Sequence, residues 1–162
     1  MTHYVSRSSN TTKKIGAVLA AEASSHLRRT NQSLVIALVG ELGSGKTTFI
    51  QGFARGLGIK QRLTSPTFLI LKRYYLPKKQ KGVKSLLSIN KNSLFHIDAY
   101  RIKRSRDLNF VDLKKIINNG KCILLIEWAD KIKRLMPKST LWIYFRHGSD
   151  EHERLIDFST KP

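Results

Sequence analysis

Cysteine is almost absent from this chain. Its 162 residues include one cysteine, Cys122, and four prolines, so an internal disulfide framework is excluded and a reducing compartment is expected. No apolar run approaches the roughly 18 residues of a membrane span. The start of the chain lacks the basic-then-apolar layout of a secretory signal. The sequence therefore predicts a cytoplasmic protein in which Cys122 fills the core rather than acting as a nucleophile.

Acidic residues are also scarce. The chain has 11 Asp and Glu against 30 Lys and Arg, which gives a net charge of +19. Such a balance favours a polyanionic partner such as RNA, or an acidic protein. A compositional drift toward lysine explains it equally well. Hydrophobic residues make up 41%, which predicts a single globular domain over 1–162.

The most informative stretch is Gly40-Glu41-Leu42-Gly43-Ser44-Gly45-Lys46-Thr47-Thr48. It has the spacing G-x-x-x-x-G-K-[ST] of a phosphate-binding loop (P-loop). A buried strand is predicted before it at 34–39, and an amphipathic helix after it. In such a loop backbone amides hold the phosphates, the lysine reaches the β- and γ-phosphates, and the hydroxyl of Thr47 binds Mg²⁺. The alternative is a glycine-rich turn that matches by chance.

Two further strand-like runs end in a carboxylate. Residues 93–98 end in Asp98, and residues 122–128 contain Glu127 near their end. Because the ends of parallel strands meet at one sheet edge, these acids are expected beside the P-loop as magnesium ligands. Alternating strands and helices predict an α/β, P-loop NTPase-like, mainly parallel sheet flanked by helices. Residues 140–145 and 154–158 are predicted as antiparallel C-terminal edge strands.

Other segments carry weaker signals. A first helix is expected to end near Arg28, and a strand is expected at 68–71. Asp107 is a candidate cap of a helix whose inner face includes Phe110, Leu113, Ile116 and Ile117. Gly52 and Gly56 predict that the helix after the P-loop packs closely on the sheet. The lysine-rich stretch 77–92 is interpreted as a loop insertion, either a contact for tRNA or a partner, or simply solvated.

Four motifs in order resemble one family. They are G-E-L-G-S-G-K-T-T (40–48), S-P-T-F (65–68), H-I-D-A-Y-R (96–101) and I-E-W (126–128), and together they resemble the bacterial TsaE (YjeE) family. The resemblance implies a weak, Mg²⁺-dependent ATPase of tRNA threonylcarbamoyladenosine (t6A) biosynthesis. It also implies a partner, the TsaB–TsaD complex, which transfers the threonylcarbamoyl group to an adenosine beside the anticodon and whose turnover the ATPase supports.

The resemblance also implies the site residues. Catalytic roles fall to Lys46, Thr67, Asp98 and Glu127, and magnesium would be held by Thr47, Glu127 and Asp98. ATP would be bound by Ser9, Gly40, Glu41, Leu42, Gly43, Ser44, Gly45, Lys46, Thr47, Thr48 and Arg154. The sequence departs from the family pattern in its long 77–92 stretch and in its final turn, 147–154, which lacks a clear polar nucleotide contact.

Two other functions fit the same sequence. A small-molecule kinase would transfer phosphate to a bound acceptor rather than to water. A basic RNA-binding module would keep the nucleotide site as a non-hydrolytic scaffold. A GTPase is disfavoured, because Asn90-Lys91-Asn92 is followed by Ser93 and so does not complete the guanine-reading motif N-K-x-D. Arg101 and Arg104 lie near the expected site, although a solvated basic face explains them better than an arginine finger.

Overall fold

The structure is a computed structural model that describes residues 2–30, 32–61, 63–66, 70–77, 93–102, 113–118 and 122–162. Its strands are β1 (Thr2–Ser6), β2 (Leu34–Gly40), β3 (Leu71–Tyr75), β4 (Ser93–Asp98), β5 (Cys122–Glu127), β6 (Leu141–His147) and β7 (Arg154–Ser159). Its helices are α1 (Ser9–Arg29), α2 (Lys46–Gly56), α3 (Leu113–Asn118) and the 3-10 helix η2 (Ala129–Leu135). Within those ranges, no helix is long and apolar enough to cross a bilayer.

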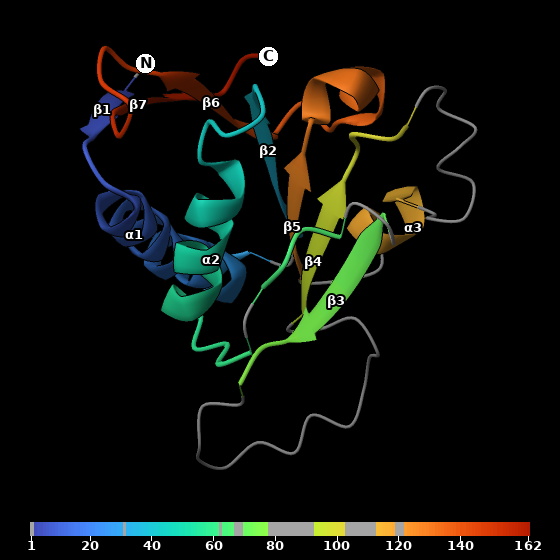
Figure 1. The fold of residues 1–162 in the computed structure, drawn as a ribbon. Coiled ribbons are helices and arrows are strands. Elements are labelled where there is room, and N and C mark those ends of the chain that lie inside the picture. Colours follow the sequence, from blue (N-terminus) through green and yellow to red (C-terminus); the bar gives the residue numbers. More distant parts are fainter. Residues whose placement is uncertain are drawn as a thin grey trace.

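The strands form one sheet in the order β1-β7-β6-β2-β5-β4-β3 (Figure 1). The central strands β6, β2, β5 and β4 are parallel to one another. The outer strands β3, β7 and β1 each run antiparallel to a neighbour. The predicted α/β class, with a mainly parallel sheet flanked by helices, is confirmed.

The C-terminal strands lie deeper in the sheet than predicted. β6 is not an edge strand, because it lies parallel beside β2 with Ile36 opposite Leu141. β7 is antiparallel to both of its neighbours, β6 and β1, and the edge strand is β1. The sequence analysis missed β1 because its side chains are mostly exposed and show no apolar alternation. His3 of β1 and Arg146 of β6 both contact the Asp157 carboxylate of β7, which ties the three strands together.

Helices cover the two faces of the sheet. α1 and α2 lie on one side, and α3 and η2 lie on the other (Figure 1). Side chains from alternate positions of the central strands point to opposite faces, so β2 sends Ile36 and Leu38 to the first side and Val35 and Ala37 to the second. The sheet is therefore buried on both faces over its parallel part, as its continuous apolar strands require.

Glycines bring α1 and α2 into close contact. A Cβ added at Gly52 would lie 2.1 Å from the Lys13 carbonyl oxygen, and one added at Gly16 would lie 2.4 Å from the Phe49 carbonyl oxygen. Gly56 also faces α1. The expectation that Gly52 and Gly56 pack on the sheet is therefore wrong, because the close approach is between two helix backbones. The glycine side of α2 therefore meets the other helix.

We expect Gly52→Ala to destabilise the protein by about 2 kcal/mol, which is the upper end of the overpacking cost less the gain in helix propensity. Alanine gains roughly 1 kcal/mol of helix propensity over glycine, but its methyl group would press against the backbone of α1, and overpacking of this kind costs about 1–3 kcal/mol or more. Chemical denaturation measures the change. Arg55→Ala, on the exposed side of the same helix, is the matched control and should stay within about 0.5 kcal/mol of the parent. An unchanged stability of Gly52→Ala would contradict the described helix contact.

The structure also tests several of the predicted helix and strand boundaries. The first helix is confirmed, and the Ser8 hydroxyl caps it by accepting a hydrogen bond from the Thr11 amide. Of the strand expected at 68–71, residues 68 and 69 lie outside the described residues, Ile70 is a left-handed kink (φ 63°), and β3 begins at Leu71. The predicted cap Asp107 and the predicted inner-face residue Phe110 lie outside the described residues, as does nearly all of the 77–92 insertion.

Cys122 lies in the core, as predicted. It is fully buried at the start of β5, with its Sγ 3.2 Å from the Ser33 hydroxyl. Burial raises the pKa of the thiol, and the contact with Ser33 opposes this only in part. A buried thiol that stays protonated is a poor nucleophile, which agrees with a packing role.

Candidate nucleotide site

The turn between β2 and α2 forms the predicted P-loop. Gly43 and Gly45 adopt left-handed φ angles of 75° and 98°, which glycine reaches at no steric cost. α2 begins at Lys46, directly after the second of these glycines. The unpaired amides of the first turn of α2 therefore open onto the loop, where the helix dipole favours an anion.

The side chain of Lys46 lies folded over this loop. Its ammonium donates hydrogen bonds of 2.7 Å to the carbonyl oxygens of Gly40 and Glu41. Only 4% of the residue is exposed. Burial lowers the pKa of the ammonium, and neighbouring carboxylates, led by Glu127, oppose that shift. A poorly hydrated cation among carbonyl oxygens interacts strongly with any anion that enters the loop.

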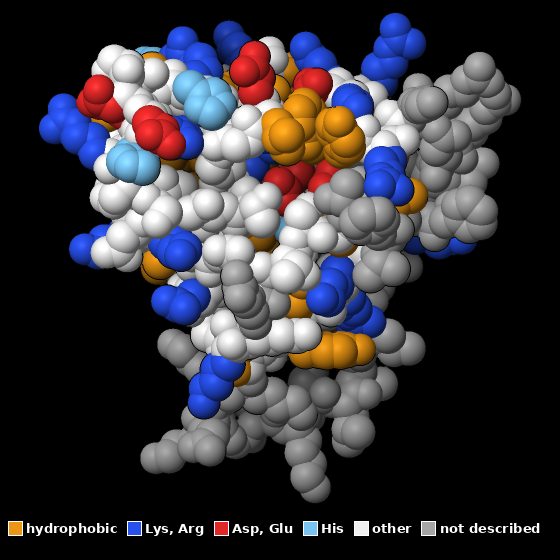
Figure 2. Space-filling view, in the orientation of Figure 1, with side chains coloured by type: hydrophobic (Ala, Val, Ile, Leu, Met, Phe, Trp, Pro, Cys, Tyr) orange, Lys and Arg blue, Asp and Glu red, His pale blue; other side chains and the backbone are white. Residues whose placement is uncertain are grey.

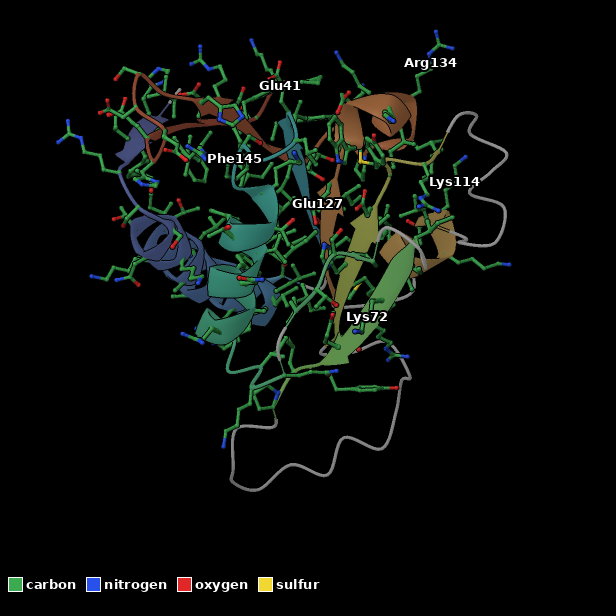
Figure 3. All side chains as sticks on the ribbon, in the orientation of Figure 1. Glu41, Lys72, Lys114, Glu127, Arg134 and Phe145 are labelled. Atoms are coloured by element: carbon green, nitrogen blue, oxygen red, sulfur yellow. The ribbon has the colours of Figure 1, made fainter. Side chains whose placement is uncertain are left out.

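Glu127 connects the end of β5 to the P-loop. Its Oε2 accepts a 2.9 Å hydrogen bond from the hydroxyl of Thr47, in the first turn of α2. The residue is 2% exposed, and Figure 3 labels it beside α2. A hydroxyl and a carboxylate held together at a phosphate loop are the hard oxygen ligands that Mg²⁺ prefers. The described residues thus place two of the three predicted metal ligands in contact.

Asp98 lies next to Glu127 across the sheet. The two acids end neighbouring parallel strands and are opposite one another in the register of β4 and β5. Asp98 Oδ2 accepts a 2.6 Å hydrogen bond from the Ser65 hydroxyl, and its Oδ1 accepts a 2.9 Å bond from the Tyr100 amide. These bonds hold the Asp98 carboxylate in place, while the hydrogen bond from Thr47 goes to Glu127.

A cavity of about 400 Å³ brings these groups together. Its lining combines P-loop residues with residues from the ends of β4 and β5: Leu42, Gly43, Ser44, Gly45, Lys46, Thr47, Thr48, Ser65, Asp98, Tyr100, Glu127 and Trp128. The rings of Tyr100 and Trp128 are 5.1 Å apart between centroids. Figure 2 shows recessed acidic side chains beneath exposed hydrophobic ones on this side of the molecule. A triphosphate entering the cavity would meet cation, amides and carboxylates together.

A smaller hollow adjoins the other side of the P-loop. It encloses about 120 Å³ and is lined by Ser8, Ser9, Thr12, Gly43, Gly45, Thr48, His152 and Arg154. Ser9 and Arg154, predicted as nucleotide contacts, therefore lie together although one begins α1 and the other begins β7. Arg154 Nε donates to the Gly43 carbonyl at 3.2 Å, which attaches the final hairpin to the loop.

Sequence reasoning missed the contacts of two residues of the site. Ser65, one of the two hydroxyl residues that flank Pro66 in the S-P-T-F motif, donates to Asp98. His96 was given no role in the site, yet its Nε2 lies 2.8 Å from Glu127 Oε1. A histidine inside an apolar strand, two residues before a candidate ligand, was the available signal. Thr67, the predicted sensor of the γ-phosphate, lies outside the described residues.

Comparisons with known proteins identify the family of this chain. Residues 6–156 match the family described as "Threonylcarbamoyl adenosine biosynthesis protein TsaE". The chain is 38% identical to the Bacillus subtilis protein named tRNA threonylcarbamoyladenosine biosynthesis protein TsaE over 77% of this chain and 68% of that one. A Treponema pallidum protein of the same name is 30% identical over 93% and 96% of the two chains.

A solved structure is similar as well. The crystal structure of Bacillus subtilis YdiB superposes with a TM-score of 0.68 and 29% sequence identity, covering 97% of this chain and 83% of that one. The family match spans the P-loop, both carboxylate-ending strands and the first half of β7. This chain therefore belongs to the TsaE family.

Proposed function

We propose that this protein binds Mg²⁺·ATP in the cavity at the P-loop and hydrolyses it. The observation that carries the proposal is the hydrogen bond of 2.9 Å between Thr47 and Glu127, which brings an acid from β5 to the loop residue that ligates magnesium. Among the described residues no group of three or more His, Cys, Asp and Glu side chains could hold a metal by itself. A cation here would need phosphate oxygens to complete its coordination, as is usual for Mg²⁺.

Each residue has a role in this proposal. The P-loop amides and Lys46 hold the β- and γ-phosphates, and Thr47 and Glu127 hold the cation. Magnesium, when bound, neutralises charge on the phosphoryl group. Asp98, fixed by Ser65 and Tyr100, orients the water that attacks in line.

The nucleoside end and the γ-phosphate sensor complete the proposed site. Ser9 and Arg154 line the hollow beside the loop, where the nucleoside would lie. Thr67 stays a prediction for the γ-phosphate sensor. Hydrolysis is expected to be weak without a partner, since phosphoryl transfer of this kind often needs an arginine supplied in trans.

We further propose that this ATPase supports the formation of t6A in tRNA. The relatives carry names that state this pathway, and the family match covers most of the chain. The partner would be the TsaB–TsaD transferase complex, whose turnover depends on ATP hydrolysis by this protein. The net charge of +19 supports additional contact with tRNA phosphates, and a role on tRNA implies a cytoplasmic location.

We expect the protein to raise multiple-turnover modification of tRNA in a reconstituted system. The reaction contains TsaB, TsaD, threonylcarbamoyl-adenylate and tRNA, and the readout is modified adenosine per TsaD molecule. Without this protein, product should stop near one equivalent of TsaD, and with it product should continue to accumulate while ATP is consumed. If product formation is independent of this protein, the pathway proposal fails and only an ATP-binding protein remains. If phosphate moves from ATP to a small acceptor instead of water, the kinase alternative holds.

A further inference from the structure

His96 occupies the middle of the most buried part of the sheet. It lies in β4 between Phe95 and Ile97, paired with β3 on one side and β5 on the other. The residue has no exposed surface. An imidazole in such a place costs free energy unless its polar atoms are used. Its Nδ1 finds no hydrogen-bond partner among the described residues. The contact of Nε2 is therefore the one that offsets the cost of burying the ring.

That contact reaches the acid of the nucleotide site. Side chains alternate along a strand, so His96 shares a sheet face with Leu94, and Glu127 shares that same face with Leu125. This is the face covered by α2. His96 Nε2 lies 2.8 Å from Glu127 Oε1, while Thr47 donates to Glu127 Oε2 at 2.9 Å. An ionised carboxylate only accepts hydrogen bonds, so a hydrogen bond between these two atoms requires a proton on Nε2.

We propose that His96 is a positioning residue that fixes the Glu127 carboxylate for magnesium. The imidazole binds Oε1 of the carboxylate inside the sheet. The other oxygen, Oε2, is thereby directed toward Thr47 in the first turn of α2. A free glutamate side chain rotates about three bonds, whereas one anchored inside the sheet cannot turn its carboxylate away from the loop. The inference rests on the proposed Mg²⁺·ATP site and adds a residue behind it.

His96 would act on Glu127 as residues behind the ligands do in other metal sites. Groups that hydrogen-bond to a ligand's second atom hold its orientation and tune its basicity, and their loss weakens metal affinity by roughly 10–100-fold. The contact here is buried on both sides, since the side chains of His96 and Glu127 are 0% and 3% exposed. Water therefore does not compete for it. The bond should hold the carboxylate in one orientation before any cation arrives.

Two nearly isosteric variants separate positioning from packing. His96→Gln places an amide nitrogen at the same number of bonds from Cα as Nε2, and so keeps a donor for Glu127. His96→Met has the same length but no donor. The readout is the ratio of the Kd for ATP in EDTA to the Kd in saturating Mg²⁺, which isolates the contribution of the cation.

We expect His96→Met to lower this ratio by about tenfold and His96→Gln to recover most of the loss. ATP affinity in EDTA should stay within about twofold of the parent for both, because the P-loop amides and Lys46 are untouched. A merely structural histidine would change both Kd values together, or change the two variants alike. An unchanged ratio in His96→Met, or equal losses in Met and Gln, would overturn the inference.

A measurement on the wild-type protein covers the case in which His96→Met does not fold. Long-range ¹H–¹⁵N spectra of histidine-labelled protein report which ring nitrogen carries the proton, and His96→Gln assigns the signal. We expect a proton on Nε2, and a ring protonated only on Nδ1 would refute the contact. If the wild-type protein shows no Mg²⁺-dependent ATP binding at all, the proposed function fails instead, and the ring signal still tests the contact.

Discussion

Lys46→Ala is expected to abolish ATP turnover, with a loss of at least about 100-fold. The ammonium is the buried cation of the loop, held over the carbonyl oxygens of Gly40 and Glu41 at 2.7 Å. A triphosphate offers oxygens of full negative charge at the same place, and removal of a charged group aimed at developing charge costs about 10²–10³-fold in rate. Phosphate release at saturating ATP and Mg²⁺ measures the effect, in the presence and absence of TsaB and TsaD.

A matched control removes a lysine charge away from the proposed site. Lys133→Ala lies on the exposed side of η2 and should retain turnover within about twofold. Thermal melting should show both variants folded, since the hydrogen bonds that Lys46→Ala removes are to the P-loop carbonyls of Gly40 and Glu41. Normal phosphate release by Lys46→Ala would remove the proposed site, whatever the behaviour of the control.

Glu127→Ala is expected to lower Mg²⁺-dependent turnover by at least about 100-fold, as for Lys46→Ala, while the protein stays folded. The side chain is the carboxylate in contact with Thr47, so its loss removes one of two proposed protein ligands to the cation. Its removal also leaves the partly buried hydroxyl of Thr47 and the buried imidazole of His96 without their acceptor, which costs about 1–3 kcal/mol each if water does not enter. Phosphate release at increasing Mg²⁺ measures the first effect, and thermal melting measures the second.

Two further variants sharpen this test. Glu127→Gln keeps the volume but carries no charge, so it should lose turnover with a smaller loss of stability than the alanine variant. Glu22→Ala removes an acid of the same charge from the exposed side of α1 and should remain active. Full activity in Glu127→Gln would show that the carboxylate is not a metal ligand. ATP binding in EDTA should persist in every variant that keeps the P-loop.

Local features of this protein follow from the sequence. The P-loop is contiguous, its glycines stand where Gly43 and Gly45 turn left-handed, and an apolar strand and an amphipathic helix flank it. The two acids were expected beside it because parallel strands end at one edge, and the register opposes Asp98 to Glu127. The cap at Ser8 is equally local. In each case the pattern that predicts the feature is contained in a short segment of the chain.

Contacts between segments far apart in the chain could not be predicted from the sequence. Ser65 binds Asp98 and His96 binds Glu127 across separations of 33 and 31 residues, and nothing in either local pattern indicates the partner. Hydrophobic spacing identifies which side of a helix is buried, but not what covers that side, which is why Gly52 was assigned to the sheet. The edge position of β1 depends on β7, at the other end of the chain.

Sequence alone thus determined the phosphate loop, the acids that end two strands and the class of the fold, because short-range geometry and periodicity specify them. Only the tertiary structure decided the strand order, the glycine contact of α1 with α2 and the bond from His96 to Glu127. Those features depend on which surfaces meet when the whole chain packs. That choice is made by shape and by satisfaction of buried polar groups over many residues at once.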